Sequence, residues 1–290
     1  MEFDAAFIGT GRVAWSLADA FVDVGYFVRF ASNRTEEPLK KFAEEFMVDE
    51  ISTNIKDISK FTSKFQVCVI AVPDSVIKEV ADTLAGLPLK FKTTLFMHLS
   101  GSKTTAELSS LKKMGAMTGS FHIPQSFPAR KAIRLWDLPV CIEASTVKAE
   151  KMMLQIARRL ELKPVCIKPE LKIYYHLAAV FASNFFPTII ADSMKMFELA
   201  GGNKKDYFKI FTPIIETTIE NIIDNGPENS VSGVISRKDF GTLQEHLNAL
   251  DSDISTREQL LTYIRLSEET AKMLGINLKI TYAKNEQEGK

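Results

Sequence analysis

The sequence predicts an α/β fold in which an N-terminal, doubly wound, mostly parallel sheet is followed by an all-α C-terminal region. Three observations predict it. A glycine-rich turn follows the first apolar run, at residues 9–14. Strand-like and helix-like segments then alternate as far as residue 168, a pattern typical of a parallel sheet covered by helices. From residue 169 onward apolar residues recur only at helical spacing.

The glycine-rich turn has the form Gly-x-Gly-x-x-Ala and lies between an apolar run, residues 3–8, and an amphipathic helix. That context is what a dinucleotide-binding turn requires. Gly9 allows the tight turn, Gly11 lets the backbone approach a pyrophosphate, and Ala14 keeps the helix close to the sheet. Free N–H groups at the helix N-terminus suit the anion. The turn therefore predicts a Rossmann domain, and an ordinary glycine turn is the alternative.

The end of the second strand indicates which dinucleotide is bound. An NAD site places an acidic residue at the end of this strand, here residues 26–31, to bond the ribose 2′-hydroxyl. The chain has Ser32, Asn33 and Arg34 there instead. A guanidinium makes charge-assisted bonds to phosphate, so NADP is favoured over NAD. The alternative is that Arg34 lies in a solvated loop.

The remaining secondary structure follows from short apolar runs and helical periodicity. Residues 66–72 form a continuous apolar run, which is typical of a strand buried on both faces of a parallel sheet, and Pro73 ends it. We expect further strands at 48–51, 93–99, 116–121, 138–143 and 165–168, with helices at 36–46, 75–84, 103–113 and 148–160. Helices at 171–200, 207–225, 240–250 and 256–274 then make up the C-terminal half. The predicted domains are residues 1–168 and 169–290.

Composition places the chain among soluble globular proteins. Hydrophobic residues make up 46% and charged residues 25%, and 36 basic residues balance 36 acidic ones. With no net charge, the chain offers no basic field for nucleic acid or an anionic membrane. Cys68, Cys141 and Cys166 lie in apolar runs, so we expect buried free thiols and a reducing, cytoplasmic location. The first strand starts at once, so we expect no signal peptide, and the apolar run 177–191 is too short to span a bilayer.

Three of the four histidines adjoin features of a cleft. His98 and His122 each end a strand, where open α/β sheets place their ligands. His176 lies on the first long helix of the C-terminal half, where Ser183 shares its face and Asn184 lies about 80° away. Pro187 removes a helix N–H, and we expect a kink there.

Each of these side chains also has a purely structural interpretation. His176 can be a core histidine with satisfied hydrogen bonds, Asn184 can hold a helix crossing, and His98 can bond a neighbouring loop carbonyl. Asp239 is placed to cap the helix that contains His246, and this interpretation leaves Arg237 unexplained. The spacing of the His, Cys and Asp residues matches no structural zinc site, so we expect no metal.

Six motifs together resemble one family over nearly the whole chain. They lie at residues 9–14, 71–74, 98–102, 120–124, 176–184 and 237–247. The chain resembles the Rossmann-like proteins with a C-terminal helical domain of unknown function, which are related to pyrroline-5-carboxylate reductase, ketopantoate reductase and the 6-phosphogluconate dehydrogenase group. The resemblance implies an NADP-linked reductase architecture with a 6-phosphogluconate dehydrogenase C-terminal-like domain for substrate binding. In those relatives, dimers form through the helical domain.

The chain departs from related patterns at two places. The family pattern Thr-Gly-Pro-x-x-Arg-Gly-Asp has Ser232, Val234 and Lys238 in place of its Thr, Pro and second Gly, which puts the geometry of that loop in doubt. Hydroxyacid dehydrogenases of the wider superfamily carry a Lys and an Asn four residues apart on the first long helix. In the equivalent stretch this chain has His176 and Asn184.

These observations predict an NADP-dependent oxidoreductase that transfers a hydride to or from a small oxo or imino acid bound between the two domains. His176 is the expected proton donor because histidine titrates near neutral pH, Asn184 and Ser183 would orient the carbonyl or imine, and His122 is the fourth catalytic candidate. The expected cofactor-binding residues are Gly9, Thr10, Gly11, Arg12, Val13, Ser32, Asn33, Arg34, Ala71, Val72, Pro73, Ser100 and Gly101. The alternatives are a non-catalytic NADP-binding redox sensor or regulatory protein, and a scaffold whose glycine turn is vestigial. The sequence does not specify the substrate.

Overall fold

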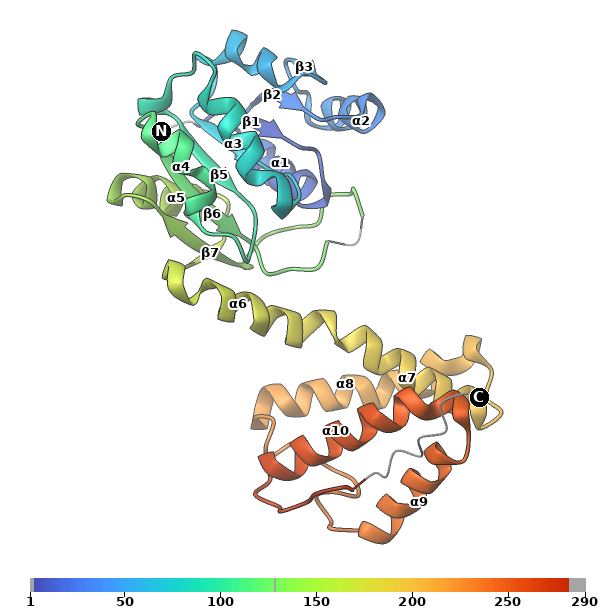
Figure 1. The fold of residues 1–290 in the computed structure, drawn as a ribbon. Coiled ribbons are helices and arrows are strands. Elements are labelled where there is room, and N and C mark those ends of the chain that lie inside the picture. The colour runs from blue at the N-terminus through green and yellow to red at the C-terminus, as the bar shows by residue number, and fades with distance from the viewer. Residues whose placement is uncertain (1–2, 128, 282–290) are drawn as a thin grey trace, which may run out of the picture. The chain divides into compact units, whose positions relative to one another are not determined.

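A single sheet forms the centre of the N-terminal part of the chain in the computed structural model, which describes residues 3–127 and 129–281 (Figure 1). Its eight strands lie in the order β3-β2-β1-β4-β5-β6-β7-β8. All neighbouring strands pair in parallel except β6 and β7, so the predicted mostly parallel sheet is confirmed. The strands are β1 Ala5–Ile8, β2 Val28–Ser32, β3 Ile51–Ser52, β4 Val67–Ile70, β5 Leu95–His98, β6 Met117–His122, β7 Pro139–Ala144 and β8 Lys163–Cys166.

Helices cover both faces of this sheet, as a doubly wound fold requires. They are α1 Arg12–Asp23, α2 Glu36–Phe46, α3 Ile77–Ala85, α4 Ser109–Lys113 and α5 Val147–Arg159. One core contains the apolar faces of α1, α2 and α5, where Phe7 of β1 packs edge-on against Phe21 and contacts Phe42. The other core contains α3 and α4, with Ile77 and Leu111 packed toward β4 and β5. The N-terminal part therefore has a complete core on each side of its sheet.

The parallel strands bring the chain segments of the site to one edge of the sheet. The central strands β1 and β4 are buried along their whole length, as their continuous apolar sequences predict. Their carboxyl ends are joined by a hydrogen bond from the Ala71 N–H to the Ile8 carbonyl at 2.7 Å, and Gly9 N–H donates to the Ser32 carbonyl at 2.7 Å. The glycine turn therefore lies beside the ends of β2 and β4.

A long helical segment follows the sheet and contains a π-helical turn. It consists of α6 Lys172–Ala179, the π turn Val180–Asn184 and α7 Phe186–Leu199. The Phe185 N–H donates to the Val180 carbonyl at 3.3 Å, five residues back, which widens the helix just before Pro187. Pro187 lacks an N–H to continue the α-helical ladder, so the irregularity expected at this proline takes the form of a π turn.

Contacts divide the chain into two compact units, Met1–Phe186 and Pro187–Lys290. This division comes one helix later than residue 168, where the strands end, because α6 belongs with the sheet. Lys172 in its first turn is buried and bonds side chains of β6 and β7.

The second unit contains helices and no strand among its described residues, as predicted. With α7 it has α8 Tyr207–Asn225, α9 Phe240–Asp251 and α10 Arg257–Met273. Its buried apolar cluster is small and centres on Ile235, Leu243 and Ala271. Asp239 caps α9 as predicted, because its Oδ1 accepts the Thr242 N–H at 3.1 Å.

The prediction for the cysteines is correct for two of them and wrong for the third. All three are free thiols, and Cys68 and Cys141 are buried. Cys166 is exposed, because β8 is the last strand of the sheet and lacks a neighbour on one side. An apolar run predicted burial for it, and the edge position overrides that pattern.

Candidate functional site

A pocket of about 400 Å³ opens at the glycine turn, at the carboxyl ends of β1, β2 and β4. Nine of the predicted cofactor-binding residues line it: Gly9, Thr10, Gly11, Ser32, Asn33, Arg34, Ala71, Val72 and Pro73. Its other walls include Thr53, Ile55, Val76, Glu79, Val80, Thr83 and Arg130. Because the pocket lies at the switch point of a doubly wound sheet, it occupies the usual ligand position of this architecture.

The backbone of the turn fits a pyrophosphate. Gly9 has a φ of +95°, and a Cβ there would lie 2.3 Å from the Ala71 carbonyl oxygen, so only glycine can occupy this position. The helix α1 starts after Gly11 with no side-chain cap and no acidic residue in its first turn. Thr10 Oγ1 is buried and has no hydrogen-bond partner in the structure. An open helix N-terminus and a buried, unpaired hydroxyl are the groups that a bound phosphate would satisfy.

The end of β2 offers side chains suited to a second phosphate. Asn33 Nδ2 donates to the Thr35 carbonyl at 3.1 Å and to Thr35 Oγ1 at 2.9 Å, so its amide stabilises its own turn. The neighbouring Arg34 is exposed at the pocket. Arg34 is therefore the predicted residue of this segment with a charged group available to a ligand.

Four predicted cofactor-binding residues do not line this pocket. Arg12 donates from Nη1 to the Phe127 carbonyl at 3.5 Å, and Val13 is part of α1. Ser100 and Gly101 belong to a neighbouring polar network that starts at Asp74, directly after Pro73.

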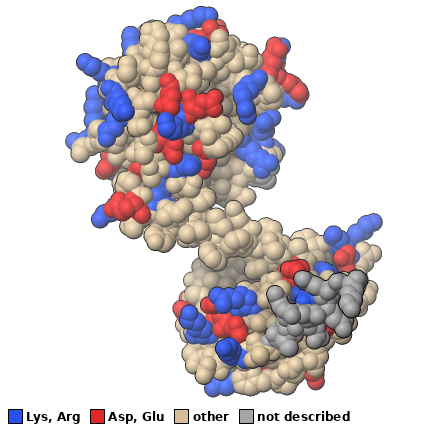
Figure 2. All heavy atoms as spheres, in the orientation of Figure 1, with Lys and Arg blue, Asp and Glu red and all other residues tan. Residues whose placement is uncertain are grey.

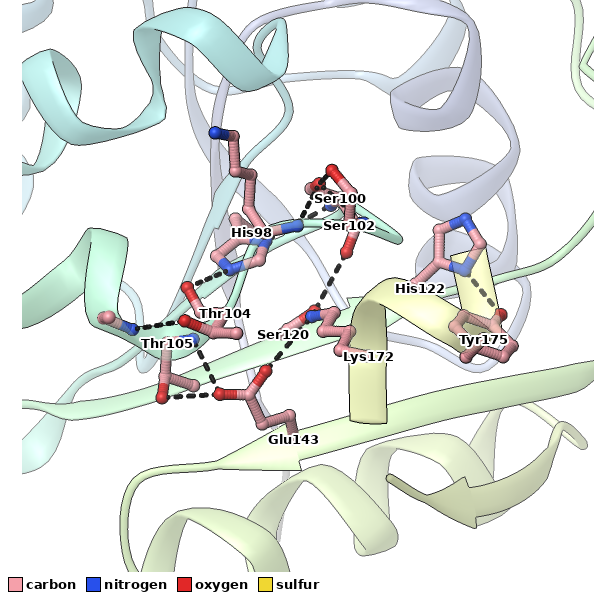
Figure 3. A network of polar contacts seen from close by, with 12 residues as sticks. His98, Ser100, Ser102, Thr104, Thr105, Ser120, His122, Glu143, Lys172 and Tyr175 are labelled. Atoms are coloured by element: carbon pink, nitrogen blue, oxygen red, sulfur yellow. Dashed lines mark hydrogen bonds and ion pairs between the residues drawn. The ribbon is translucent and has the colours of Figure 1, made fainter. Parts of the chain in front are cut away.

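A buried ion pair lies at the centre of that network (Figure 3). Lys172 Nζ of α6 is 3.2 Å from Glu143 Oε2 of β7 and also donates to Ser120 Oγ of β6. The two charged side chains are 4% and 3% exposed. Glu143 Oε1 accepts the Thr105 N–H at 2.7 Å and the Thr105 hydroxyl at 2.8 Å. Both charges are therefore hydrogen-bonded, which is the condition under which a buried pair is tolerated.

The network continues from the ion pair to the edge of the cofactor pocket. Ser120 Oγ donates to the Ser100 carbonyl at 3.1 Å. Ser100 Oγ then donates to Asp74 Oδ2 at 2.6 Å, and Ser102 Oγ donates to the same oxygen at 2.9 Å. The loops after β4 and β5 and the strand β6 are thereby joined in one hydrogen-bonded chain.

His98 has a structural role in this network. Its Nδ1 accepts the Ser100 N–H at 3.2 Å, so its Nε2 carries the hydrogen and donates to the Thr104 carbonyl at 3.1 Å. Burial, together with the positive charge of Lys172, lowers the pKa of His98 to about 4. The ring is therefore neutral at pH 7, and it bonds a loop carbonyl, as its structural interpretation predicts.

His122 lies between the loop after β5 and helix α6. Its Nδ1 is 2.6 Å from the Tyr175 hydroxyl, and a Cβ at Gly101 would lie 2.8 Å from its Nε2. Burial and the charge of Lys172 lower the pKa of His122 to about 4, and burial raises the pKa of Tyr175. Both groups are neutral at pH 7, and Gly101 is required because any side chain there would displace the imidazole.

His176 lies one helical turn after Lys172 on α6. Its Nδ1 is buried without a hydrogen-bond partner, and His176 is close enough to His122 to contribute to the lowered pKa of that imidazole. The structure therefore brings His122 and His176 into one neighbourhood within the first unit. Ser183 and Asn184 lie further along, in the π turn, and are exposed there.

Sequence reasoning missed the central residues of the network, Lys172 and Glu143, as well as the hydrogen bonds of Asp74 and the place of Arg130 in the pocket wall. Two signals were present: Lys172 lies in a mainly apolar helix four residues before His176, and Glu143 ends an apolar strand. Each signal alone is also typical of a solvated side chain, so only the tertiary contact distinguishes them.

Two further features of the described residues bear on the function. No group of three or more His, Cys, Asp or Glu side chains among them could hold a metal ion. The helical segment Pro169–Leu199 is 31 residues long, and an 18-residue window in it has a mean hydropathy of 1.3, enough to cross a membrane by length and composition alone. The helix is longer than the apolar run 177–191, so length does not exclude a span, but Lys172 in its first turn is bound to the sheet.

Comparison with known proteins gives the class first. Residues 4–92 match the family described as NADP oxidoreductase, coenzyme F420-dependent, and residues 138–270 match a domain of unknown function (DUF2520). The chain therefore combines an N-terminal pyridine-nucleotide oxidoreductase domain with this C-terminal domain of unknown function, and the predicted family resemblance is confirmed. The second match begins at β7, so it includes the part of the sheet that supplies Glu143.

Solved structures share the fold over most of the chain. A candidate NADP oxidoreductase from Bacteroides fragilis is 22% identical, covers 93% of this chain and 98% of its own, and has a TM-score of 0.76. A pyrroline-5-carboxylate reductase from Coxiella burnetii is 18% identical over 94% of this chain and 99% of its own, with a TM-score of 0.55. A reductive aminase from Aspergillus terreus, in complex with NADPH and ethyl-5-oxohexanoate, is 13% identical over 96% and 89%, with a TM-score of 0.59. No curated protein sequence matches the chain.

The buried ion pair predicts an asymmetric response to substitution. Lys172→Met leaves the Glu143 charge buried with only Thr105 to bond it, and we expect a loss of about 3–5 kcal/mol in the free energy of unfolding. Adding Glu143→Gln should recover part of the loss, because the amide oxygen still accepts from Thr105 and no charge is buried. Urea unfolding measures the stability of both variants.

The control is Lys78→Met, which breaks an exposed pair with Asp82 and should lower the free energy of unfolding by less than about 1 kcal/mol. Equal losses in the single and double variants would contradict this account.

The neutral His98 predicts an acid-sensitive fold. The folded-state pKa of about 4 lies below the ordinary value of 6.5, so the unfolded chain binds the proton first as pH falls through this window. Stability is present above pH 6.5 and is lost toward pH 4, with about 2 kcal/mol lost through this one group between about pH 7 and pH 5. Denaturant unfolding at both pH values tests this. His98→Gln, which cannot titrate, should show a smaller loss, and an unchanged pH slope would refute the assignment.

Proposed function

We propose that this chain is an NADP-dependent oxidoreductase that reduces a small oxo or imino acid, or oxidises the corresponding hydroxy or amino acid. The observation that carries the proposal is the pocket at the glycine turn. There the buried, unpaired Thr10 hydroxyl and the uncapped N-terminus of α1 could bind a pyrophosphate. Arg34 occupies the position at which an NAD site has an acidic residue. When bound, the nicotinamide supplies or accepts the hydride.

Different residues of the first unit would bind the cofactor and orient the substrate. The pyrophosphate would be held by the turn Gly9 to Gly11 and by Thr10 Oγ1, and the 2′-phosphate by Arg34. Reduction of a carbonyl or imine also requires one proton, delivered to the substrate oxygen or nitrogen. His122 is neutral at pH 7 and bonded to Tyr175, so it suits orientation of the substrate rather than proton delivery.

His176 is the remaining candidate for the proton donor. Its Nδ1 is buried and has no hydrogen-bond partner among the described residues, so a bond to a substrate atom would satisfy it, and helix α6 is fixed to the sheet by Lys172 one turn earlier. Ser183 and Asn184, exposed in the π turn, are the groups that would orient the carbonyl or imine. π turns occur frequently at functional sites, which supports a role for this segment.

The test is substrate-dependent oxidation of NADPH by the full chain, screened against 2-oxo acids, cyclic imines and aldehydes, with NADH in parallel. We expect turnover with NADPH on at least one class, and a fall of roughly 100- to 10,000-fold in kcat for His176→Ala. His246→Ala is the control, since His246 bonds Tyr263 in the second unit. Full activity of His176→Ala would remove it as proton donor. Tight NADPH binding with no turnover on any class would favour a redox sensor.

We also propose that the chain works as a homodimer formed through its helical unit. Apolar side chains on two helices of this unit are exposed: Ile189 and Leu199 of α7, and Phe208, Ile210, Ile214, Ile219, Ile222 and Ile223 of α8. Helices of soluble proteins bury such faces, and the small cluster around Ile235 and Leu243 leaves these uncovered. Figure 2 shows lysine and arginine interspersed with acidic side chains on the visible face, and the chain as a whole has no net charge.

The dimer predicts twice the chain mass of 32.5 kDa in light scattering without detergent. Ile223→Glu, at a side chain 76% exposed on α8, should convert the protein to a monomer by burying a charge in the interface. Ile254→Glu is the control, because Ile254 is 80% exposed but lies in the 3-10 turn before α10. A monomeric wild type, or a wild type recovered only with membranes, would contradict the proposal.

A further inference from the structure

The chain after β6 is held to helix α1, which starts at the glycine turn, by hydrogen bonds at Phe127 and Ile133. Ile133 N–H donates to Ser16 Oγ at 3.0 Å, and the Phe127 carbonyl accepts from Arg12 Nη1 at 3.5 Å. Phe127 and Ile133 pack against the core that contains α1, α2 and α5, and Leu135 is buried in it. These contacts on both sides of residue 130 hold this part of the chain at the cofactor pocket, although it lies about a hundred residues from Arg34 in the sequence.

Arg130, in the middle of this segment, lines the cofactor pocket together with Arg34. Its position can be specified further through Glu37, in the first turn of α2. The pKa of the Glu37 carboxyl is lowered by its hydrogen bond to Lys41 and by the Lys41 charge, with a further contribution from Arg130. Arg34 lies three residues before Glu37 and lines the same pocket as Arg130.

The two acids at the start of α2 are each paired with a lysine, while Glu79 of α3 also lines the pocket. Glu36 pairs with Lys40 at 2.8 Å and Glu37 pairs with Lys41 at 2.7 Å, each one turn along α2. The pocket therefore presents two guanidinium groups at the end of β2, where the ribose of a dinucleotide lies in this fold. A phosphate monoester carries close to two negative charges and can accept hydrogen bonds from both groups.

We propose that Arg130 is a second phosphate-binding residue of the cofactor pocket and that, with Arg34, it holds the 2′-phosphate and sets the preference for NADP over NAD. The residue that selects NADP would then come partly from the chain after β6, and not only from the turn after β2. This inference rests on the proposed NADP-dependent function and names the residues that select its cofactor.

The test compares dissociation constants for NADPH, NADH, 2′,5′-ADP and 5′-AMP by calorimetry on the full chain. Arg130→Ala should weaken NADPH and 2′,5′-ADP by roughly 10- to 100-fold, the effect of losing a charge-assisted hydrogen bond to the 2′-phosphate. NADH and 5′-AMP should change by less than about threefold, because they lack the 2′-phosphate. Arg130→Lys should restore only part of the affinity, since an ammonium cannot bond two phosphate oxygens in the planar geometry of a guanidinium.

Lys131→Ala is the matched control, because it removes one positive charge from the next, exposed residue of the same segment. It should leave all four affinities unchanged. Equal weakening of NADPH and NADH by Arg130→Ala, or no weakening of either, would overturn the inference. If wild type prefers NADPH and Arg34→Ala abolishes the preference while Arg130→Ala does not, only the role of Arg130 fails. If wild type shows no preference for NADPH, the NADP assignment in the proposed function fails, and this inference fails with it.

Discussion

The arrangement of the candidate site depends on one buried interaction, the ion pair between Lys172 and Glu143. Taking two charges out of water costs several kcal/mol for each ion, and their attraction offsets that cost only where further hydrogen bonds satisfy both groups. Here the carboxylate accepts two bonds from Thr105, and the ammonium donates to Ser120. The pair therefore constrains β6, β7, the 3-10 turn Thr105–Leu108 before α4 and the first turn of α6 together. Because α6 also carries Tyr175, the partner of His122, and His176, the positions of these two side chains follow from this contact.

The same network connects the cofactor pocket with the side chains around Lys172 within the first unit. Its chain of hydrogen bonds ends at Asp74, directly after the Pro73 that lines the cofactor pocket. In the same loop after β4, the Ala71 carbonyl oxygen leaves no space for a side chain at position 9, so this residue must be glycine. Parallel strands place these loops at one edge of the sheet, and the network then fixes their distances. Burial, together with the positive charge of Lys172, lowers the pKa of both His98 and His122 to about 4, so both imidazoles are neutral at pH 7.

The fold was predictable because its determinants are local, and the candidate site was predictable only in part. The glycine turn, the apolar strand at β4 and the helical periodicity after residue 169 each specify an element within a few neighbouring residues. Nine of the predicted cofactor residues meet in one pocket for the same reason, since strand ends determine where they lie. Lys172 and Glu143 are 29 residues apart and lie in elements whose own patterns are satisfied without them. Arg130 lies in a segment without periodicity, and the exposure of Cys166 depends on the place of β8 in the sheet.

The two units differ in how completely they bury their own apolar residues, and this difference has a functional consequence. The sheet of the first unit is covered on both faces, so the cofactor pocket belongs to a structure with its own complete core. The helices of the second unit bury only a small cluster and expose apolar residues along α7 and α8. Apolar burial is the main favourable term in folding, so a unit with so small a core needs another surface against it. If a second copy provides that surface, association and the stability of the helical unit are linked by mass action. Cofactor binding would then depend on residues of one chain, while the integrity of the helical unit would depend on two.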